Sequence, residues 1–239
     1  LLATALLFWF FTYSDPNHKV ASSVKFSEQL RLMKDPAVLR YGQYYSVVFG
    51  GYVGLSLWMV SYYVQEYGFS LTQAAFLAAC FSLPGGVLRA LGGWLSDKYG
   101  AYKVTWAVMW VCWVAFFILS YPQTAMTINT INGPMSFDIG INATVFTIIL
   151  FVVGIAMAIG KASVFKFIAD ENMGTVSGVV GLAGGLGGFL LPILFGLLVD
   201  FTGVRSSSFM LMYGCVCVSL IWMHFSFKPI QKQELLKDN

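Results

Sequence analysis

Long apolar runs separated by short polar segments occupy most of the chain. Six full runs cover about residues 40–66, 71–95, 102–121, 143–166, 175–200 and 207–227, and a shorter run opens the chain. A helix of about 20 apolar residues crosses the hydrocarbon core of a bilayer, so each full run is long enough for one span. The pattern predicts an all-α membrane protein with six complete transmembrane helices.

Local signals refine the boundaries of these helices. Asp35 followed by Pro36 predicts an N-cap and a first-turn proline for the first full span. Ser70 to Gln73 reads SLTQ and predicts a capping box at the start of the second full span. Pro84, Gly85 and Gly86 interrupt that span, so we expect a kink there.

The polar segments divide the chain into four parts. They are the end of a truncated transmembrane helix (1–14), a cytoplasmic central loop (15–40), a six-helix transmembrane bundle (41–228) and a cytoplasmic tail (229–239). The opening run has no charged segment before it, so we expect a further amino-terminal part upstream of Leu1. Within the loop, Phe26, Leu30 and Met33 recur at helical spacing and predict a short helix on the membrane surface.

Composition supports a membrane protein. The chain is 58% hydrophobic and only 10% charged, whereas soluble domains have about 25% charged residues. Its net charge of +3 comes from dispersed basic residues, which disfavours nucleic-acid binding. The four cysteines lie in apolar runs and are interpreted as small buried hydrophobes. We therefore expect no metal, no cofactor and no enzyme chemistry.

The basic residues predict the orientation in the membrane. Alternating spans place twelve of the fourteen Lys and Arg residues, Lys161 and Lys166 included, on the side of the 15–40 loop. The opposite side keeps only Arg205, and Arg89 lies in neither group. By the positive-inside rule the loop and the carboxy terminus are cytoplasmic, in a multi-pass protein of the cytoplasmic membrane.

Arg89 is the principal candidate for function. It lies about seven residues, or roughly 10 Å, inside the cytoplasmic end of the second full span. An arginine within the membrane costs about 2.5 to 3.5 kcal/mol, so it usually faces a cavity or a partner. Its planar guanidinium suits a small planar oxyanion. The alternatives are an arginine that snorkels to the cytoplasmic interface or one that is paired with an acid.

A loop motif follows the same span. Gly93, Asp97 and Gly100 form G-x-x-x-D-x-x-G, followed by Lys103, and residues 196–205 repeat the pattern at the opposite membrane face. An inverted repeat of a transporter would place two such motifs in this way. We expect their charged residues to tie neighbouring helix ends together and to gate a rocking motion.

The glycine-rich stretch GLAGGLGGFLLP, residues 181–192, has three possible interpretations. A phosphate loop needs a Lys-Ser/Thr pair after its last glycine, and a flexible linker would be polar, so neither fits. Glycines at helical spacing let membrane helices approach closely, which favours a packing stripe in the fifth full span. The stripe comprises Gly174, Gly178, Gly181, Gly185, Gly188, Pro192 and Gly196, widened by Gly184 and Gly187.

Two segments resemble a known family. Residues 160–192, GKASVFKFIADENMGTVSGVVGLAGGLGGFLLP, resemble the nitrate signature of the nitrate/nitrite porter (NarK-type) family of the major facilitator superfamily. Residues 92–103, GGWLSDKYGAYK, resemble a cytoplasmic loop motif of that superfamily. The resemblance implies the major facilitator fold, with this chain as the end of helix six, the central loop and helices seven to twelve.

The resemblance also implies roles for single residues. Arg89 matches a substrate-binding arginine, and Tyr45 and Phe49 match aromatic residues that hydrogen-bond to and wall the substrate; core or lipid-facing aromatics are the alternative. Gly184, Gly185, Gly187 and Gly188 match the signature that packs against the site, so we expect a bulky residue at Gly185 or Gly188 to abolish transport. Lys161 stands where many relatives have a small or amide residue, and its role stays open.

The function implied is transport of nitrate and/or nitrite across the cytoplasmic membrane by alternating access. It would be nitrate/nitrite antiport or proton-coupled uptake, and the scarcity of intramembrane acids and histidines favours exchange. The expected partners are nitrate, nitrite, the bilayer and an amino-terminal half with a second substrate arginine. The alternatives are a major facilitator for another small anion, or a membrane sensor or subunit that does not transport.

Overall fold

The computed structural model describes residues 2–11, 34–168 and 173–237. The surface helix expected around Phe26, Leu30 and Met33 lies outside these residues. The helices are α1 (Leu2–Phe11), α3 (Pro36–Tyr45), the π-helix η1 (Ser46–Gly51), α4 (Tyr52–Tyr67), α5 (Leu71–Val87), α6 (Arg89–Tyr99), α7 (Ala101–Leu119), α8 (Ala143–Phe165), α9 (Met173–Thr202) and α10 (Ser207–Lys237). Two strands, β1 (Thr124–Thr130) and β2 (Gly133–Ile139), complete the described fold.

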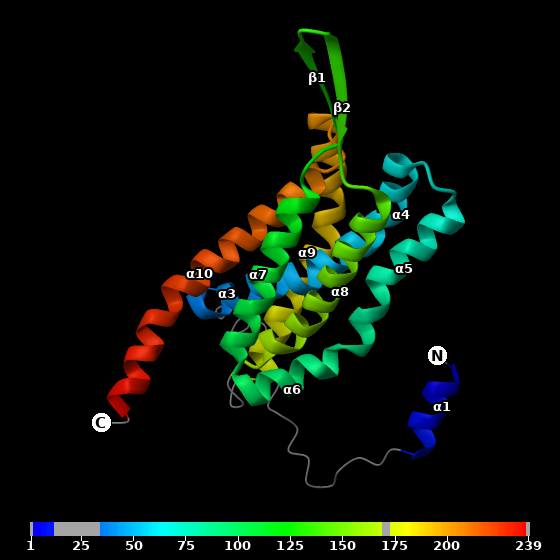
Figure 1. Cartoon of the computed structure of the whole chain (residues 1–239). Coiled ribbons are helices and arrows are strands. Elements are labelled where there is room, and N and C mark those ends of the chain that lie inside the picture. Colours follow the sequence, from blue (N-terminus) through cyan, green and yellow to red (C-terminus); the bar gives the residue numbers. More distant parts are fainter. Residues whose placement is uncertain (1, 12–33, 169–172, 238–239) are drawn as a thin grey trace.

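The helices form a bundle whose elements suit six membrane crossings. Among the described residues, five helical segments are long and apolar enough to span a membrane, and the bent pair α5 and α6 makes a sixth. The first of them runs without interruption through α3, η1 and α4, over Pro36–Tyr67. The predicted spans are therefore confirmed, and α1 lies apart from the bundle (Figure 1).

The first span begins earlier than the predicted domain boundary. The Asp35 carboxylate accepts a hydrogen bond of 2.8 Å from the backbone N–H of Ala37, and Pro36 occupies the first turn. The predicted cap is confirmed, and the helix begins at Pro36, within the segment that the sequence assigns to the central loop.

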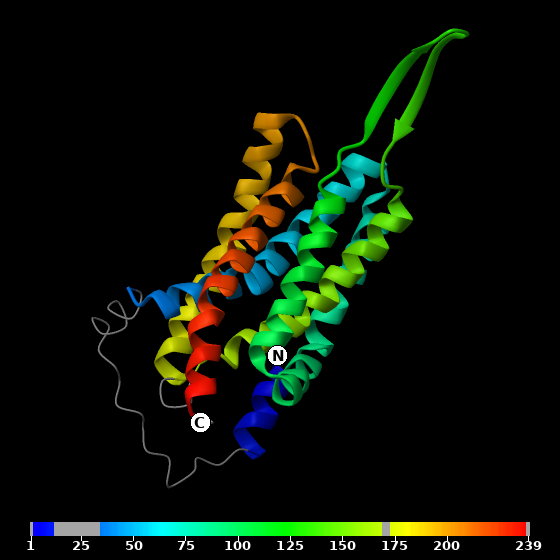
Figure 2. The same ribbon diagram turned by 60° about the vertical axis from the view of Figure 1, so that its left-hand side comes forward.

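Successive spans run antiparallel, so their connections gather at two ends. The α4–α5 turn, the strands and the α9–α10 turn lie at one end, and the α6–α7 turn lies at the other (Figures 1 and 2). The predicted capping box is present, since Ser70 and Gln73 exchange side-chain and backbone hydrogen bonds. Gly68 ends α4 at φ +69°, a left-handed conformation that glycine adopts without steric cost.

The second full span is broken at the predicted position. Pro84 lies inside α5, the helix ends at Val87, and α6 starts at Arg89. The axes of α5 and α6 differ by 48°. Proline removes a backbone donor and crowds the preceding turn, which accounts for the break one turn later. Arg89 is therefore the first residue after a bend.

The connector between α7 and α8 forms a β-hairpin that was not predicted. The antiparallel strands pair Met126 with Phe137 and Thr127 with Ser136. The hairpin projects beyond the end of the bundle (Figure 2). A sequence signal was present, because alternating apolar and polar positions flank a turn that contains Asn132 and is followed by Gly133.

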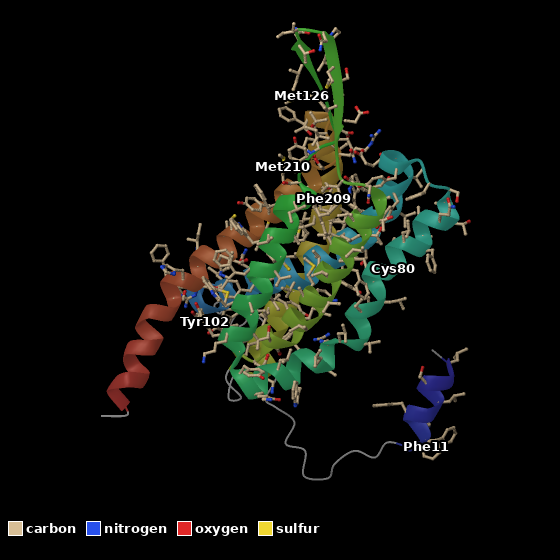
Figure 3. All side chains as sticks on the ribbon, in the orientation of Figure 1. Phe11, Cys80, Tyr102, Met126, Phe209 and Met210 are labelled. Carbon is tan, nitrogen blue, oxygen red and sulfur yellow. The ribbon has the colours of Figure 1, made fainter. Side chains whose placement is uncertain are left out.

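Aromatic and small residues build the core around α8. Phe146, Phe195 and Phe209 are fully buried, and Figure 3 shows Phe209 inside the bundle while its neighbour Met210 lies outside. Glycines let other helices approach α8 closely. A Cβ at Gly92 of α6 would lie 2.7 Å from the Cα of Ile159, so only glycine fits there.

We predict that Gly92→Ala lowers the thermal unfolding midpoint of the intact protein in detergent. The added methyl group overlaps the backbone of α8, and overpacking of this kind costs about 1 to 3 kcal/mol. The matched control is Gly93→Ala, where a Cβ meets no atom within 4 Å. Alanine favours a helix over glycine by up to about 1 kcal/mol, so this variant should unfold at the same or a higher temperature. Equal midpoints for the two variants would contradict the packing.

Candidate anion-binding site

Arg89 presents its charge at an open side of the bundle. Its side chain is exposed, although it belongs to a segment within the apolar span. The ion pairs recorded among the described residues are Lys166 with Asp97 and Arg205 with Glu66, and neither includes Arg89. The guanidinium therefore has no carboxylate partner in the part of the chain that the structure describes.

Aromatic side chains surround the guanidinium. The rings of Tyr45 and Phe49 stack with centroids 5.1 Å apart, and Phe165 meets Tyr45 edge-on at 4.6 Å. The Arg89 Cζ lies 6.0 Å from the Phe165 ring centroid, within the range of a cation–π interaction. The Tyr45 side chain also lies near enough to Arg89 to feel its positive charge. The structure thus brings the three predicted residues together and adds Phe165.

The two aromatic residues of the first span meet at a π-helix. Tyr45 is the last residue of α3, and Phe49 lies within η1. A π-helical turn holds an extra residue and is frequent at functional sites. The turn ends in Gly50 and Gly51, both buried, so this part of the span presents bare backbone to its neighbours.

Helix α9 packs against this π-helix through its signature glycines. A Cβ at Gly184 would lie 3.0 Å from the Phe49 ring and would overlap the Tyr45 ring. A Cβ at Gly187 would approach the Ser46 carbonyl oxygen at 3.1 Å. These glycines let the backbone of α9 form the wall behind the aromatic pair.

The signature glycines do not all lie on one side of α9. A Cβ at Gly188 would lie 3.2 Å from Val53, whereas one at Gly181 or Gly185 would meet no atom within 4 Å. The expectation that Gly185 packs against the site therefore has no support from contacts within this chain. Glycines spaced by 3 and 4 residues form a broad stripe along a helix. Some of them can therefore face the first span while others face away from it.

Lys161 is buried rather than located on the cytoplasmic surface, where the orientation count placed it. It lies within α8 and is only 4% exposed. Its Nζ is 3.0 Å from the centroid of the Tyr52 ring, and its charge interacts with that of Arg89. Lys161 and Phe165 are four residues apart and so share one face of α8, which is the sequence signal that was missed.

Charged residues of the loop motif and of its repeat join helix ends at the two ends of the bundle. The Asp97 carboxylate accepts a bond of 2.6 Å from Lys166, which joins the end of α6 to the end of α8. Among the described residues, Lys103 forms no ion pair. At the other end of the bundle, Arg205 pairs with Glu66 at 3.0 Å rather than with Asp200.

Comparison of the sequence with known families and proteins gives consistent matches. The family model described as Major Facilitator Superfamily matches residues 1–192. The probable nitrate/nitrite antiporter NarK1 of Thermus thermophilus is 36% identical over 215 residues, which is 87% of this chain and 48% of that protein. The probable nitrate transporter NarT of Staphylococcus haemolyticus is 26% identical over 226 residues, covering 93% and 53%. The chain spans about half the length of the curated relatives it matches.

Solved structures show the same fold. The fucose:proton symporter FucP of E. coli superposes with a TM-score of 0.67 at 19% identity, covering 94% of this chain and 52% of that one. The xylose transporter XylE of E. coli, in an inward-open conformation, gives a TM-score of 0.52 at 14% identity, covering 84% and 47%. The predicted all-α fold is confirmed.

We predict that Gly184→Ala loosens η1 in the intact protein. The new methyl group must displace the Tyr45 or Phe49 ring, so backbone amides of Ser46–Gly51 should exchange with deuterium about tenfold faster, as measured by mass spectrometry. Gly185→Ala is the matched control, because its methyl group meets open space in this chain. Unchanged exchange in Gly184→Ala would contradict the contact between α9 and η1.

Proposed function

Because the chain belongs to the Major Facilitator Superfamily, we propose that it forms the carboxy-terminal half of a transporter for nitrate and/or nitrite. The transporter works by alternating access in the cytoplasmic membrane. The observation that carries the proposal is the Arg89 guanidinium, exposed beside Tyr45 and Phe165 with no described carboxylate partner. The relatives whose names include nitrate or nitrite support this choice of anion.

The chemistry of the cluster suits a small planar oxyanion. A guanidinium has planar N–H groups that can donate two parallel hydrogen bonds to two oxygens of one anion. The hydroxyl of Tyr45 interacts with Arg89 and can donate to a third oxygen. The aromatic rings shield one side of these donors from water, which strengthens hydrogen bonds to a charged group on that side. The cluster therefore suits a small planar oxyanion such as nitrate.

In this proposal an amino-terminal half of the transporter completes the binding site on the exposed side of Arg89. A single arginine exposed on one face of a half-length chain leaves the anion accessible from that side. An arginine and a first glycine signature from an amino-terminal half would close it. Gly181 and Gly185 also have free space at their Cβ positions and offer a surface on which a helix of that half can pack closely.

The alternating motion would use the break and the ion pairs. The bend between α5 and α6 gives the second span a point at which Arg89 can change its orientation. The Asp97–Lys166 and Glu66–Arg205 pairs lie at opposite ends of the bundle and join helix ends there. The Asp97–Lys166 pair is exposed, and pairs of this kind are worth about 1 kcal/mol or less, so it can open and close during each cycle.

We predict that Arg89→Lys in the intact transporter impairs nitrate uptake into proteoliposomes. Lysine keeps the charge but loses the planar pair of donors, so kcat/KM should fall by about 100-fold or more. Arg205→Lys is the matched control, because Arg205 lies at the end of the bundle and its pair with Glu66 requires only a charge. Near-normal uptake by Arg89→Lys would favour an arginine that only snorkels to the membrane surface.

The same vesicles test the choice of substrate. We predict that unlabelled nitrate and nitrite both compete with labelled nitrate for uptake. Competition by another small anion alone would indicate a major facilitator with different selectivity. Absence of any anion flux from the wild-type protein would indicate a membrane sensor or subunit, and would overturn the proposed function.

A further inference from the structure

Lys161 is a buried cation that the proposed binding cluster does not use. It lies in the interior of the bundle, 4% exposed. Removing an ammonium group from water is costly unless an opposite charge or several hydrogen bonds compensate. A lysine at such a place within a membrane span therefore calls for a functional explanation.

The groups around Lys161 do not neutralise it. From α4, the ring of Tyr52 faces the ammonium at 3.0 Å, and from α6, Arg89 contributes a like charge. From the other helices that pack on α8, which are α3, η1, α5 and α7, the structure records no charged group acting on Lys161. Its described environment therefore contains two positive charges and no recorded ion pair.

Tyr52 is fixed between Lys161 and the break in the second span. Its hydroxyl donates to the carbonyl oxygen of Ser82, and its ring lies 5.1 Å from that of Phe81. Gly85 makes this position possible, since a Cβ there would overlap the Tyr52 hydroxyl. The ring thus covers the ammonium on one side and contacts the segment that leads into Arg89 on the other.

Lys161 also shares its helix face with the wall of the site. Phe165, one turn further along α8, lies under the Arg89 guanidinium. Lys161 therefore lies one helical turn from the aromatic wall on the same side of α8, and its charge interacts with that of Arg89.

We propose that Lys161 is a second cation of the anion site, which acts on the bound anion through its charge from behind the Tyr52 ring. The inference rests on the proposed function and adds an affinity-determining residue to it. In this account Lys161 does not contact the anion, because its ammonium is buried against the Tyr52 ring. An anion held by Arg89 compensates the buried charge of Lys161, and the two cations together favour a monovalent anion over an empty site.

The test measures the concentration dependence of nitrate uptake by the intact transporter. Lys161→Met removes the charge at nearly constant length, and we expect KM for nitrate to rise about tenfold with Vmax within about threefold of wild type. Lys161→Arg keeps the charge, and its KM should stay within about threefold of the wild-type value. Unchanged KM in Lys161→Met, or an equal defect in both variants, would overturn the proposal.

Two further measurements distinguish a failure of this proposal from misfolding of the variant and from a failure of the proposed function. Replacing an uncompensated buried charge by an apolar side chain does not destabilise, so Lys161→Met should unfold at the wild-type temperature or above it. If it does not fold, Lys161→Gln takes its place with the same expected KM. Saturable nitrate uptake by the wild type, together with an unaltered KM in the neutral variant, would refute the role of Lys161 alone.

Discussion

The close approach of two backbones, between η1 and α9, determines the geometry of this helical bundle. A Cβ at Gly50 would lie 2.8 Å from the Cα of Gly187 and 2.9 Å from the carbonyl oxygen of Gly184. No side chain fits on either surface, so glycines are required although each costs a helix about 1 kcal/mol relative to alanine. Tyr45 and Phe49 take their positions from this contact, and Arg89 meets the wall that they form.

The distribution of charge follows a second constraint. At the two ends of the bundle, where water is accessible, cations are paired with carboxylates, as in Asp97 with Lys166 and Glu66 with Arg205. Within the spans, Arg89 and Lys161 have aromatic neighbours instead. Lys161 is buried and Arg89 is exposed within an apolar span. Charges left uncompensated at such positions cost stability, so the arrangement favours an anion as the missing partner.

Features that depend on a short stretch of sequence could be predicted. Apolar runs located the spans, Asp35 and Ser70 identified two helix starts, and Pro84 located the break before Arg89. Features that depend on distant parts of the chain could not be predicted in this way. The π-helix has no simple sequence code, and helical spacing alone cannot tell Gly184 from Gly185, because the distinction depends on which face of α9 meets η1. Lys161 was assigned to the surface by its charge, and only the fold reveals its burial behind Tyr52.

The most direct test of the account is an experimental structure of the intact transporter with nitrate bound. We expect the anion within hydrogen-bonding distance of the Arg89 guanidinium and the Tyr45 hydroxyl, beside Phe49 and the glycines of α9, with a cation of the amino-terminal half on its open side. An anion bound elsewhere, with the Arg89 side chain extended to the membrane surface, would contradict the central claim.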